Sequence, residues 1–259
     1  NFGKKTGIDL PGEKTGVYPS TAWKMKTYKK PWLPGDTVSA SIGQGYFLAT
    51  PLQVANATAI LANAGNHLTP HLLSKTTGAV KYSPANKPDG KIPFRGTEQD
   101  WLKMQTAMEL TVKSGTAKGV YTDRYRLAGK TGTAQVKSIA QGKRYNEAAL
   151  SERHRDHGWF IAFAPVDNPQ IAVAVIVENG RGGSKVAPIA RKAIDYWLLT
   201  RHTNPITPPS PEQLAKINAE KQQLRLQRQE AILSGKPIVS KPSLSKSTAA
   251  ELTAVGDAD

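Results

Sequence analysis

The stretch that decides the fold of this 259-residue chain reads Ala128-Gly129-Lys130-Thr131-Gly132-Thr133-Ala134-Gln135. It fits an extended strand, in which successive side chains alternate between the two faces. Lys130 and Gly132 are therefore expected on one face, with Thr131 and Thr133 on the other. Glycine lets a second backbone approach closely, and a hydroxyl beside an ammonium group is a good hydrogen-bond partner for a carboxylate. The segment predicts a strand edge that can receive an anionic, extended ligand.

The same letters allow a second interpretation, the end of a phosphate-binding loop. That loop has the form Gly-x-x-x-x-Gly-Lys-Ser/Thr, and Gly129-Lys130-Thr131 match its last three positions. Its first glycine would fall at position 124, where the chain has Arg124. The sequence therefore disfavours a phosphate loop, and the surroundings of the strand have to decide.

Several segments accompany this strand in a characteristic order. They are residues 7–13 (GIDLPGE), 35–37 (GDT), 41–46 (SIGQGY), 49–53 (ATPLQ), 155–165 (RDHGWFIAFAP) and 177–180 (VENG). Together with the Lys-Thr-Gly-Thr strand they resemble the C-terminal part of the transpeptidase domain of class B penicillin-binding proteins, a family with a Lys-Thr-Gly motif. The resemblance covers about residues 1–200 and is greatest for the elongation-specific members of that family.

The resemblance implies both a fold and a reaction. The fold is an incomplete penicillin-binding or serine β-lactamase-like one, of the α/β class in its α+β form. It consists of an antiparallel sheet flanked by helices and is followed here by a disordered tail. The reaction is peptidoglycan D,D-transpeptidation, in which a serine is acylated by a stem peptide ending in D-Ala-D-Ala. β-Lactams acylate the same serine, and no metal or organic cofactor is implied.

Roles in the family carry over to four matching residues. Lys130 would raise the local positive potential, and Thr131 and Thr133 would bind the terminal carboxylate of the substrate. Gly132 would leave room for the substrate backbone, and the backbone N–H of Thr133 would be an oxyanion donor. The resemblance also implies a periplasmic domain anchored in the inner membrane, a membrane-embedded glycosyltransferase partner and an elongation complex. The start of the chain, residues 1–5 (NFGKK), has no apolar core of a signal peptide.

Two further motifs of the family are missing from the sequence. They are a Ser-x-x-Lys that holds the nucleophile and a Ser-x-Asn or Ser-x-Asp. The one Ser-x-x-Lys, Ser243-Leu244-Ser245-Lys246, follows Lys241-Pro242 in a polar tail and is interpreted as a chance match. We therefore expect the chain to be a piece of a longer enzyme, inactive alone, with its nucleophilic serine and its membrane anchor upstream.

Charge and composition leave a second class of function open. The net charge is +15, mostly within residues 1–200, and the absence of cysteine excludes thiolate metal sites. The densest basic segment, residues 23–32 (WKMKTYKKPW), mixes cations with aromatic rings that could stack on bases. No nucleic-acid-binding signature accompanies it, and a solvated basic loop beside an anionic membrane is the preferred interpretation. The alternative to an enzyme is a non-catalytic binding or scaffold domain that recognises an acidic peptide or another polyanion.

The sequence His154-Arg155-Asp156-His157 suggests a metal or acid–base cluster at first sight. Strand alternation would point Asp156 and His157 to opposite faces, and no second pair of residues has zinc-ligand spacing. We interpret this segment as structural, anchoring the start of the strand that follows it.

Periodicity and capping residues predict the elements around the site. Thr50 caps a helix that has Pro51 at its first position and that Gly65 stops, with Leu52, Ala55, Ala59 and Ala62 on a narrow face. Thr97 caps a helix over 98–112, with Trp101, Met104, Met108 and Thr111 along one side. A third helix is expected over 186–199, with Ile189, Ile194 and Trp197 toward a sheet. Strands are expected over 126–136, 158–164 and 171–177, the last of them central because both of its faces are apolar.

The expected domain organisation has two parts. Residues 1–200 form the C-terminal part of the transpeptidase domain, with residues 81–95 a loop or short strand. Residues 201–259 form a flexible tail, because Pro205, Pro208, Pro209 and Pro211 interrupt regular structure. Residues 212–233 have helix-forming composition but too few apolar residues for a core, so they predict at most a transient helix.

Overall fold

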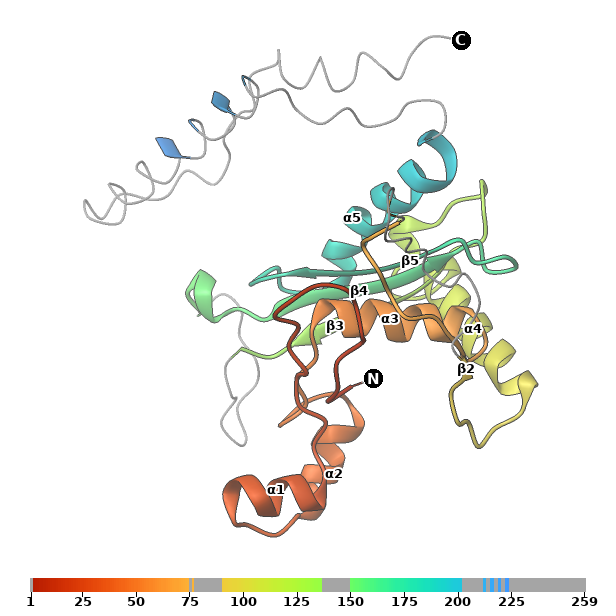
Figure 1. The fold of residues 1–259 in the computed structure, drawn as a ribbon. Coiled ribbons are helices and arrows are strands. Elements are labelled where there is room, and N and C mark those ends of the chain that lie inside the picture. The colour runs from red at the N-terminus through yellow and green to blue at the C-terminus, as the bar shows by residue number, and fades with distance from the viewer. Residues whose placement is uncertain are drawn as a thin grey trace, which may run out of the picture. The chain divides into compact units, whose positions relative to one another are not determined.

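The computed structural model describes residues 2–74, 76, 90–136 and 150–201, together with residues 212, 215, 216, 219, 222 and 223. The chain divides into two units, residues 1–204 and 205–259. The first unit contains a three-stranded antiparallel sheet of order β3-β4-β5 (Figure 1). Its strands are β3 (Ala128–Ala134), β4 (His157–Ala164) and β5 (Ile171–Val177). The three predicted strands are therefore confirmed, with β3 shorter at each end than the predicted 126–136.

Helices lie on both faces of this sheet. Figure 1 shows α5 on one face, with α3 and α4 on the other side. The described elements of the first unit, besides β3 to β5, are α1 (Thr21–Tyr28), α2 (Pro34–Ser41), α3 (Pro51–Ala62), β1 (Asn66–His67), β2 (Gly90–Lys91), α4 (Glu98–Lys113), the 3-10 turns η1 (Lys118–Val120) and η3 (Glu152–His154), α5 (Gly183–Asp195) and the π-helical turn η4 (Tyr196–Thr200). An antiparallel sheet flanked by helices is thus confirmed.

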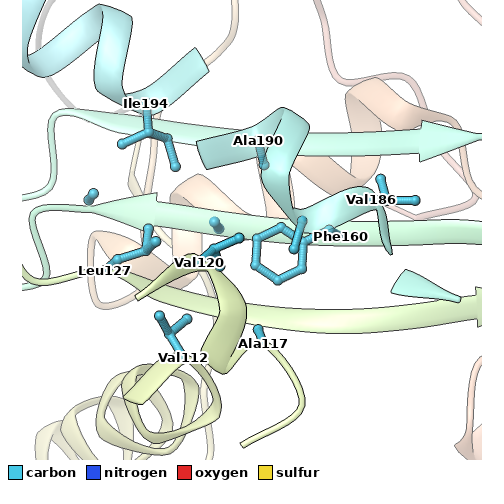
Figure 2. Close-up of a cluster of buried hydrophobic side chains, with 11 residues drawn as sticks. Val112, Ala117, Val120, Leu127, Phe160, Val186, Ala190 and Ile194 are labelled. Carbon is cyan, nitrogen blue, oxygen red and sulfur yellow. The ribbon is translucent and has the colours of Figure 1, made fainter. Parts of the chain in front are cut away.

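The core sits on the two faces of β4. On one face, Phe160 and Ala162 are buried against Val186 and Ile194 of α5 (Figure 2). The end of α4, the turn η1 and the entry to β3 complete this cluster, with Val112, Ala117, Val120 and Leu127. On the other face, Phe163 belongs to a cluster that joins α3, α4 and β3 through Ala62, Met108 and Ala128. Both phenylalanine side chains are fully buried, so β4 is the most protected strand of the described sheet.

The prediction that residues 171–177 form a central strand is wrong for the described sheet. β5 pairs with β4 along one edge, and its residues are only half-buried. Both of its faces are nevertheless covered, because α3 packs on one and α5 on the other. Apolar residues on both faces report coverage by helices and carry no information on how many edges of a strand are paired.

The helix α3 begins as the sequence predicts. The hydroxyl of Thr50 accepts a hydrogen bond from the N–H of Gln53, and the Gln53 side chain accepts one from the N–H of Thr50, which makes a capping box. The helix ends at Ala62, and Gly65, predicted as its stop, follows with a left-handed φ of 87° and an N–H that donates to the carbonyl of Ile60 (2.8 Å). The predicted face needs correction, since Leu52 is half-buried and the fully buried residues include three polar ones: Gln53, Asn56 and Thr58.

The other two predicted helices are confirmed, and their buried faces differ from the expected ones. In α4, Trp101 and Met108 are buried as predicted, whereas Met104 is exposed. The buried stripe of α4 instead continues through Gln105, Glu109 and Val112. In α5, Ile194 is fully buried, but Ile189 and Trp197 are 50% and 38% exposed. Besides Ile194, the buried side of α5 consists of smaller residues: Gly183, Val186, Ala187 and Ala190.

The basic segment 23–32 is a loop only in its last four residues. Its first part belongs to α1, which is capped by the hydroxyl of Ser20 accepting from the N–H of Trp23 (3.1 Å). Lys24 is buried, forms a salt bridge with Asp36 of α2, and lies 5.7 Å from the centre of the Tyr46 ring. One cation of this basic segment, expected to be solvated, is therefore used inside the molecule to join α1 to α2.

The remaining expectations fall partly outside the described residues. Within 81–95, residues 90–91 form β2, and 81–89 lie outside the described part. In the tail, the six described residues are helical and lie within the predicted 212–233 helix, with Lys216 and Glu212 forming an exposed i,i+4 pair at 3.7 Å. Ser243 also lies outside the described residues. Across the ranges that are described, no helix is both long and apolar enough to cross a membrane.

Candidate functional site

The Lys-Thr-Gly-Thr segment lies on β3, at one edge of the described sheet. Lys130 pairs with Ile161 of β4, and Thr133 pairs with Gly158. Within the described residues β4 is the single strand that pairs with β3, so the other edge of β3 faces outward. Lys130 and Thr133 are exposed, while Thr131 and Gly132 are half-buried. The structure therefore brings all four predicted site residues together on one strand edge.

Two side chains identify which backbone groups point outward. The Lys130 ammonium donates to the carbonyl of Thr131 (2.8 Å), and the side-chain amide of Gln44 donates to the carbonyl of Thr133 (3.2 Å). In an antiparallel ladder, the N–H and C=O of one residue point to the same edge. Since β4 occupies the inner edge, the N–H of Thr133 points outward together with its carbonyl. This is the direction that an oxyanion donor needs.

The side chains of this strand take part in different contacts. The hydroxyl of Thr131 lies 2.8 Å from the hydroxyl of Thr116, in the turn that follows α4. Gly183, the first residue of α5, lies close to the backbone of Gly132. A Cβ placed on Gly183 would lie 2.6 Å from the Gly132 nitrogen and 2.2 Å from the Trp159 carbonyl oxygen. The start of α5 therefore packs directly on the β3–β4 backbone beside the site.

A buried carboxylate fixes the entry to β3. Glu109 of α4 accepts two hydrogen bonds from the guanidinium of Arg126, at 2.9 and 2.8 Å, and lies 3.1 Å from the Lys113 ammonium. The hydrogen bonds from Arg126 are the main cause that lowers the pKa of Glu109 from 4.5 to about 2. Lys113 lowers it further, and burial acts in the opposite direction. This carboxylate stays ionised at neutral pH and ties α4 to the residue two positions before β3.

A second network ties the same entry to α5. The Tyr125 hydroxyl donates to Asp195 (2.7 Å), which also accepts from the guanidinium of Arg191 (2.9 Å). Arg191 donates in turn to the carbonyls of Val120 and Tyr121. Burial, followed by the hydrogen bond to Asp195, raises the pKa of Tyr125. β3 is thus held from both sides of the sheet before the site residues begin.

The histidine-containing segment at 154–157 makes structural contacts. The ring nitrogen Nδ1 of His157 accepts from the N–H of Asn179 (2.9 Å), and the buried Asp156 carboxylate accepts from the N–H of Val136 (3.3 Å). The Asn179 side chain donates to the carbonyl of Arg155 (2.8 Å). These bonds join the end of β3, the start of β4 and the turn after β5, as the structural interpretation predicts. Among the described residues, no three His, Asp or Glu side chains gather into a metal-binding group.

Sequence reasoning missed two residues that contact the strand, Gln44 and Thr116. Gln44 belongs to the 41–46 segment, which served as a mark of resemblance and was given no role. Its signal is the pair of flanking glycines, Gly43 and Gly45, which have left-handed φ values of 73° and 71°. Thr116 has no comparable signal, because the residues next to it in the sequence do not predict a contact with a strand that begins twelve residues later.

Comparison with known proteins identifies the family to which this chain belongs. Residues 1–195 match the model of the penicillin binding protein transpeptidase domain. The chain therefore belongs to the penicillin-binding protein transpeptidase family. Within that family it is similar to penicillin-binding protein 2, the peptidoglycan D,D-transpeptidase MrdA.

Curated relatives and solved structures support the same grouping. The peptidoglycan D,D-transpeptidase MrdA of Acinetobacter baumannii is 61% identical over 207 residues, covering 80% of this chain and 31% of that protein. The Haemophilus influenzae MrdA is 46% identical over 77% of this chain and 31% of its own length. The Pseudomonas aeruginosa PBP2 structure, solved in complex with WCK 5153, has a TM-score of 0.65 and 42% identity over 78% of this chain and 42% of that one. A Helicobacter pylori PBP2–MreC complex gives a TM-score of 0.61 with 34% identity, over 76% of this chain and 34% of that one. The chain spans about a third of the length of the curated relatives it matches.

Proposed function

We propose that this chain supplies the substrate-binding strand of a peptidoglycan D,D-transpeptidase that cross-links stem peptides during cell elongation. The observation that carries the proposal is the outward edge of β3, where Lys130, two threonine hydroxyls and the Thr133 N–H lie together. The similarity to MrdA proteins supports the choice of reaction.

The chemistry assigns one task to each group on this edge. The hydroxyls of Thr131 and Thr133 bind the terminal carboxylate of a stem peptide ending in D-Ala-D-Ala, beside the charge of Lys130. A serine from outside this sequence attacks the penultimate carbonyl, and the Thr133 N–H stabilises the oxyanion that forms. Loss of one such donor typically raises the barrier by about 3 to 4 kcal/mol. The terminal D-Ala leaves, and the amine of a second stem peptide resolves the acyl-enzyme to form the cross-link. β-Lactams acylate the same serine, and the proposal contains no metal or organic cofactor.

The proposed setting follows from the substrate. Cross-linking of peptidoglycan takes place on the periplasmic side of the inner membrane, so we place this chain in the periplasmic domain of a membrane-anchored protein. The H. pylori PBP2 structure is a complex with MreC, and we propose a partner of that kind for the protein that contains this chain. A membrane-embedded glycosyltransferase that polymerises the glycan strands is proposed as a second partner.

The experiment that tests the reaction is acylation by benzylpenicillin, followed by intact-protein mass spectrometry. Two proteins are compared: this chain, and the same chain extended upstream to include a Ser-x-x-Lys, called the parent protein below. A covalent adduct is expected on the parent protein alone, mapped to the serine of that motif. An adduct on this chain, at Ser243 or any other serine, would overturn the assignment of the nucleophile. No adduct on either protein would favour the non-catalytic binding or scaffold domain instead.

A further inference from the structure

The turn after α2 presents one glutamine side chain in a defined direction. Gln44 lies between Gly43 and Gly45, whose φ values of 73° and 71° suit glycine. The N–H of Gln44 donates to the carbonyl of Ser39 (2.9 Å), which fixes the turn against the last part of α2. α2 is itself held by the salt bridge from Asp36 to the buried Lys24. The side chain of Gln44 is thus carried on an anchored turn.

That side chain ends on the proposed substrate-binding edge. Its amide nitrogen lies 3.2 Å from the carbonyl oxygen of Thr133, although the two residues are 89 positions apart in the sequence. A side-chain amide offers the same N–H donor as a peptide group. Hydrogen-bonded strands lie about 4.8 Å apart, with N···O distances of about 2.9 Å. The Gln44 nitrogen therefore makes a hydrogen bond to the Thr133 carbonyl, the acceptor that the peptide nitrogen of a strand paired with β3 would use.

An extended ligand needs the same acceptor, if the proposed function holds. In an antiparallel hydrogen-bonded pair, two opposite residues exchange both of their N–H···O bonds. A ligand residue whose carbonyl takes the Thr133 N–H therefore aims its own N–H at the Thr133 carbonyl. For an acylaminopenicillin this residue is the one that carries the β-lactam carbonyl and the side-chain amide. That amide N–H needs the Thr133 carbonyl, to which the Gln44 side chain already donates.

We infer that Gln44 is an internal competitor for the Thr133 carbonyl and determines specificity at this edge. The Gln44 carboxamide is displaced from the Thr133 carbonyl when an acyl donor with an N–H beside the attacked carbonyl pairs with β3. A donor without this N–H leaves the Gln44–Thr133 bond in place. Gln44 consequently reduces the difference in acylation rate between ligands that have this N–H and ligands that lack it. The contact is exposed, which suits a bond that is made and broken at each encounter.

The test uses the parent protein and a matched pair of ligands. They are benzylpenicillin and its analogue methylated on the side-chain amide nitrogen, and second-order acylation rates are measured for both. Gln44→Met keeps the length of the side chain and removes the donor. Its control is Gln170→Met, which changes an exposed glutamine in the turn before β5. In Gln44→Met we expect the benzylpenicillin rate to rise about threefold to tenfold, the value of one net hydrogen bond, with the methylated analogue unchanged. Gln170→Met should leave both rates unchanged.

Two results would overturn this role. An unchanged ratio of the two rates would show that Gln44 does not compete, and a fall in both rates would show that it supports β3 instead. Gln44→Ala serves as the second variant, with the same expectation, if Gln44→Met does not fold. Acylation of the wild-type protein distinguishes failure of the proposed function from failure of the role given to Gln44. If neither ligand acylates it, the proposed function fails and this inference with it; if both do and the ratio is unchanged in the variant, the inference alone fails.

Discussion

At the scale of single residues, the proposed site depends on groups that lie outside the Lys130–Thr133 segment. Glu109 is an acidic residue in the buried stripe of α4. It can be buried there because salt bridges with Arg126 and Lys113 neutralise its charge. The bidentate Arg126 contact holds the chain two residues before β3 begins. A carboxylate of this kind has a folded-state pKa below its ordinary value, so it contributes stability where it is ionised and loses that contribution in acid.

Replacement of this carboxylate gives the first prediction. Glu109→Gln should lower the free energy of unfolding at pH 7 by about 1.5–3 kcal/mol, the usual range for hydrogen bonds to charged groups. With a pKa lowered from 4.5 to about 2, the Glu109 contribution is complete above pH 4.5 and is lost as the pH falls toward 2. The variant should therefore lose less stability than the wild type over that window. Urea unfolding at a series of pH values measures both effects.

The control for that prediction lies on the same helix. Glu98 pairs with Lys91, but its side chain is 71% exposed. Exposed pairs contribute about 0–1 kcal/mol, so Glu98→Gln should change stability little. Equal pH dependence in wild type and Glu109→Gln would contradict the role given to the buried carboxylate.

At the scale of elements, the site is shaped by how closely α5 packs on the sheet. Its first residue, Gly183, leaves no space for a Cβ above Gly132 and Trp159, and Gly158 of β4 meets Val186 in the same way. Small residues at both contacts let the helix start lie on the strand backbone. The position of β3 is thus coupled to α5 at the level of Gly132.

Filling this contact gives the second prediction. Gly183→Ala should destabilise the protein by about 1–3 kcal/mol or more, because the added methyl group overpacks the contact. It should also slow acylation of the parent protein, because β3 has to move. Gly35→Ala is the control, since a Cβ there meets no atom within 4 Å, and it should be neutral or slightly stabilising. Thermal unfolding and acylation by a fluorescent penicillin measure the two effects, and equal behaviour of both variants would contradict the coupling.

The elements also mark how far the sequence could be interpreted. Thr50, Thr97 and Gly65 act through local hydrogen bonds or local backbone geometry, so the helix ends they define could be predicted. Met104 and Ile189 lie on the expected apolar sides and are exposed, because the direction of the partner surface is set by residues distant in sequence. The same limit applies to the site. The strand alternation of Lys130 to Thr133 could be predicted, whereas the approach of Gln44 across 89 positions could not.

At the scale of the whole molecule, the chain has two units of different character. The first, residues 1–204, contains the sheet and both hydrophobic clusters. The second, residues 205–259, begins with several prolines and contains no aromatic residue. Sequence composition predicts that this second part stays flexible, since it cannot bury enough apolar surface to offset its conformational entropy.

Limited proteolysis provides the third prediction. Trypsin at low concentration should remove residues 205–259 first and leave a stable product that ends near Arg201, detected by mass spectrometry over time. Lysines and arginines are present in both units, so the order of cleavage reports structure and not the distribution of sites. Resistance of the tail for as long as the β3–β4 region would contradict its assignment as flexible.

The measurement that tests the central claim most directly is made on Lys130, Thr131 and Thr133 in the parent protein. Acylation rate and melting temperature are determined together for Lys130→Ala, Thr131→Ala and Thr133→Ala. Each threonine variant should acylate about tenfold to a hundredfold more slowly, through loss of a charge-assisted hydrogen bond of about 1.5–3 kcal/mol. Lys130→Ala should slow acylation at least as much, since the cation is removed. The melting temperatures should hardly change, because Lys130 and Thr133 are exposed and Thr131 is only half-buried. Unchanged acylation rates with lowered melting temperatures would contradict the account, because the strand would then be structural and the substrate site would lie elsewhere.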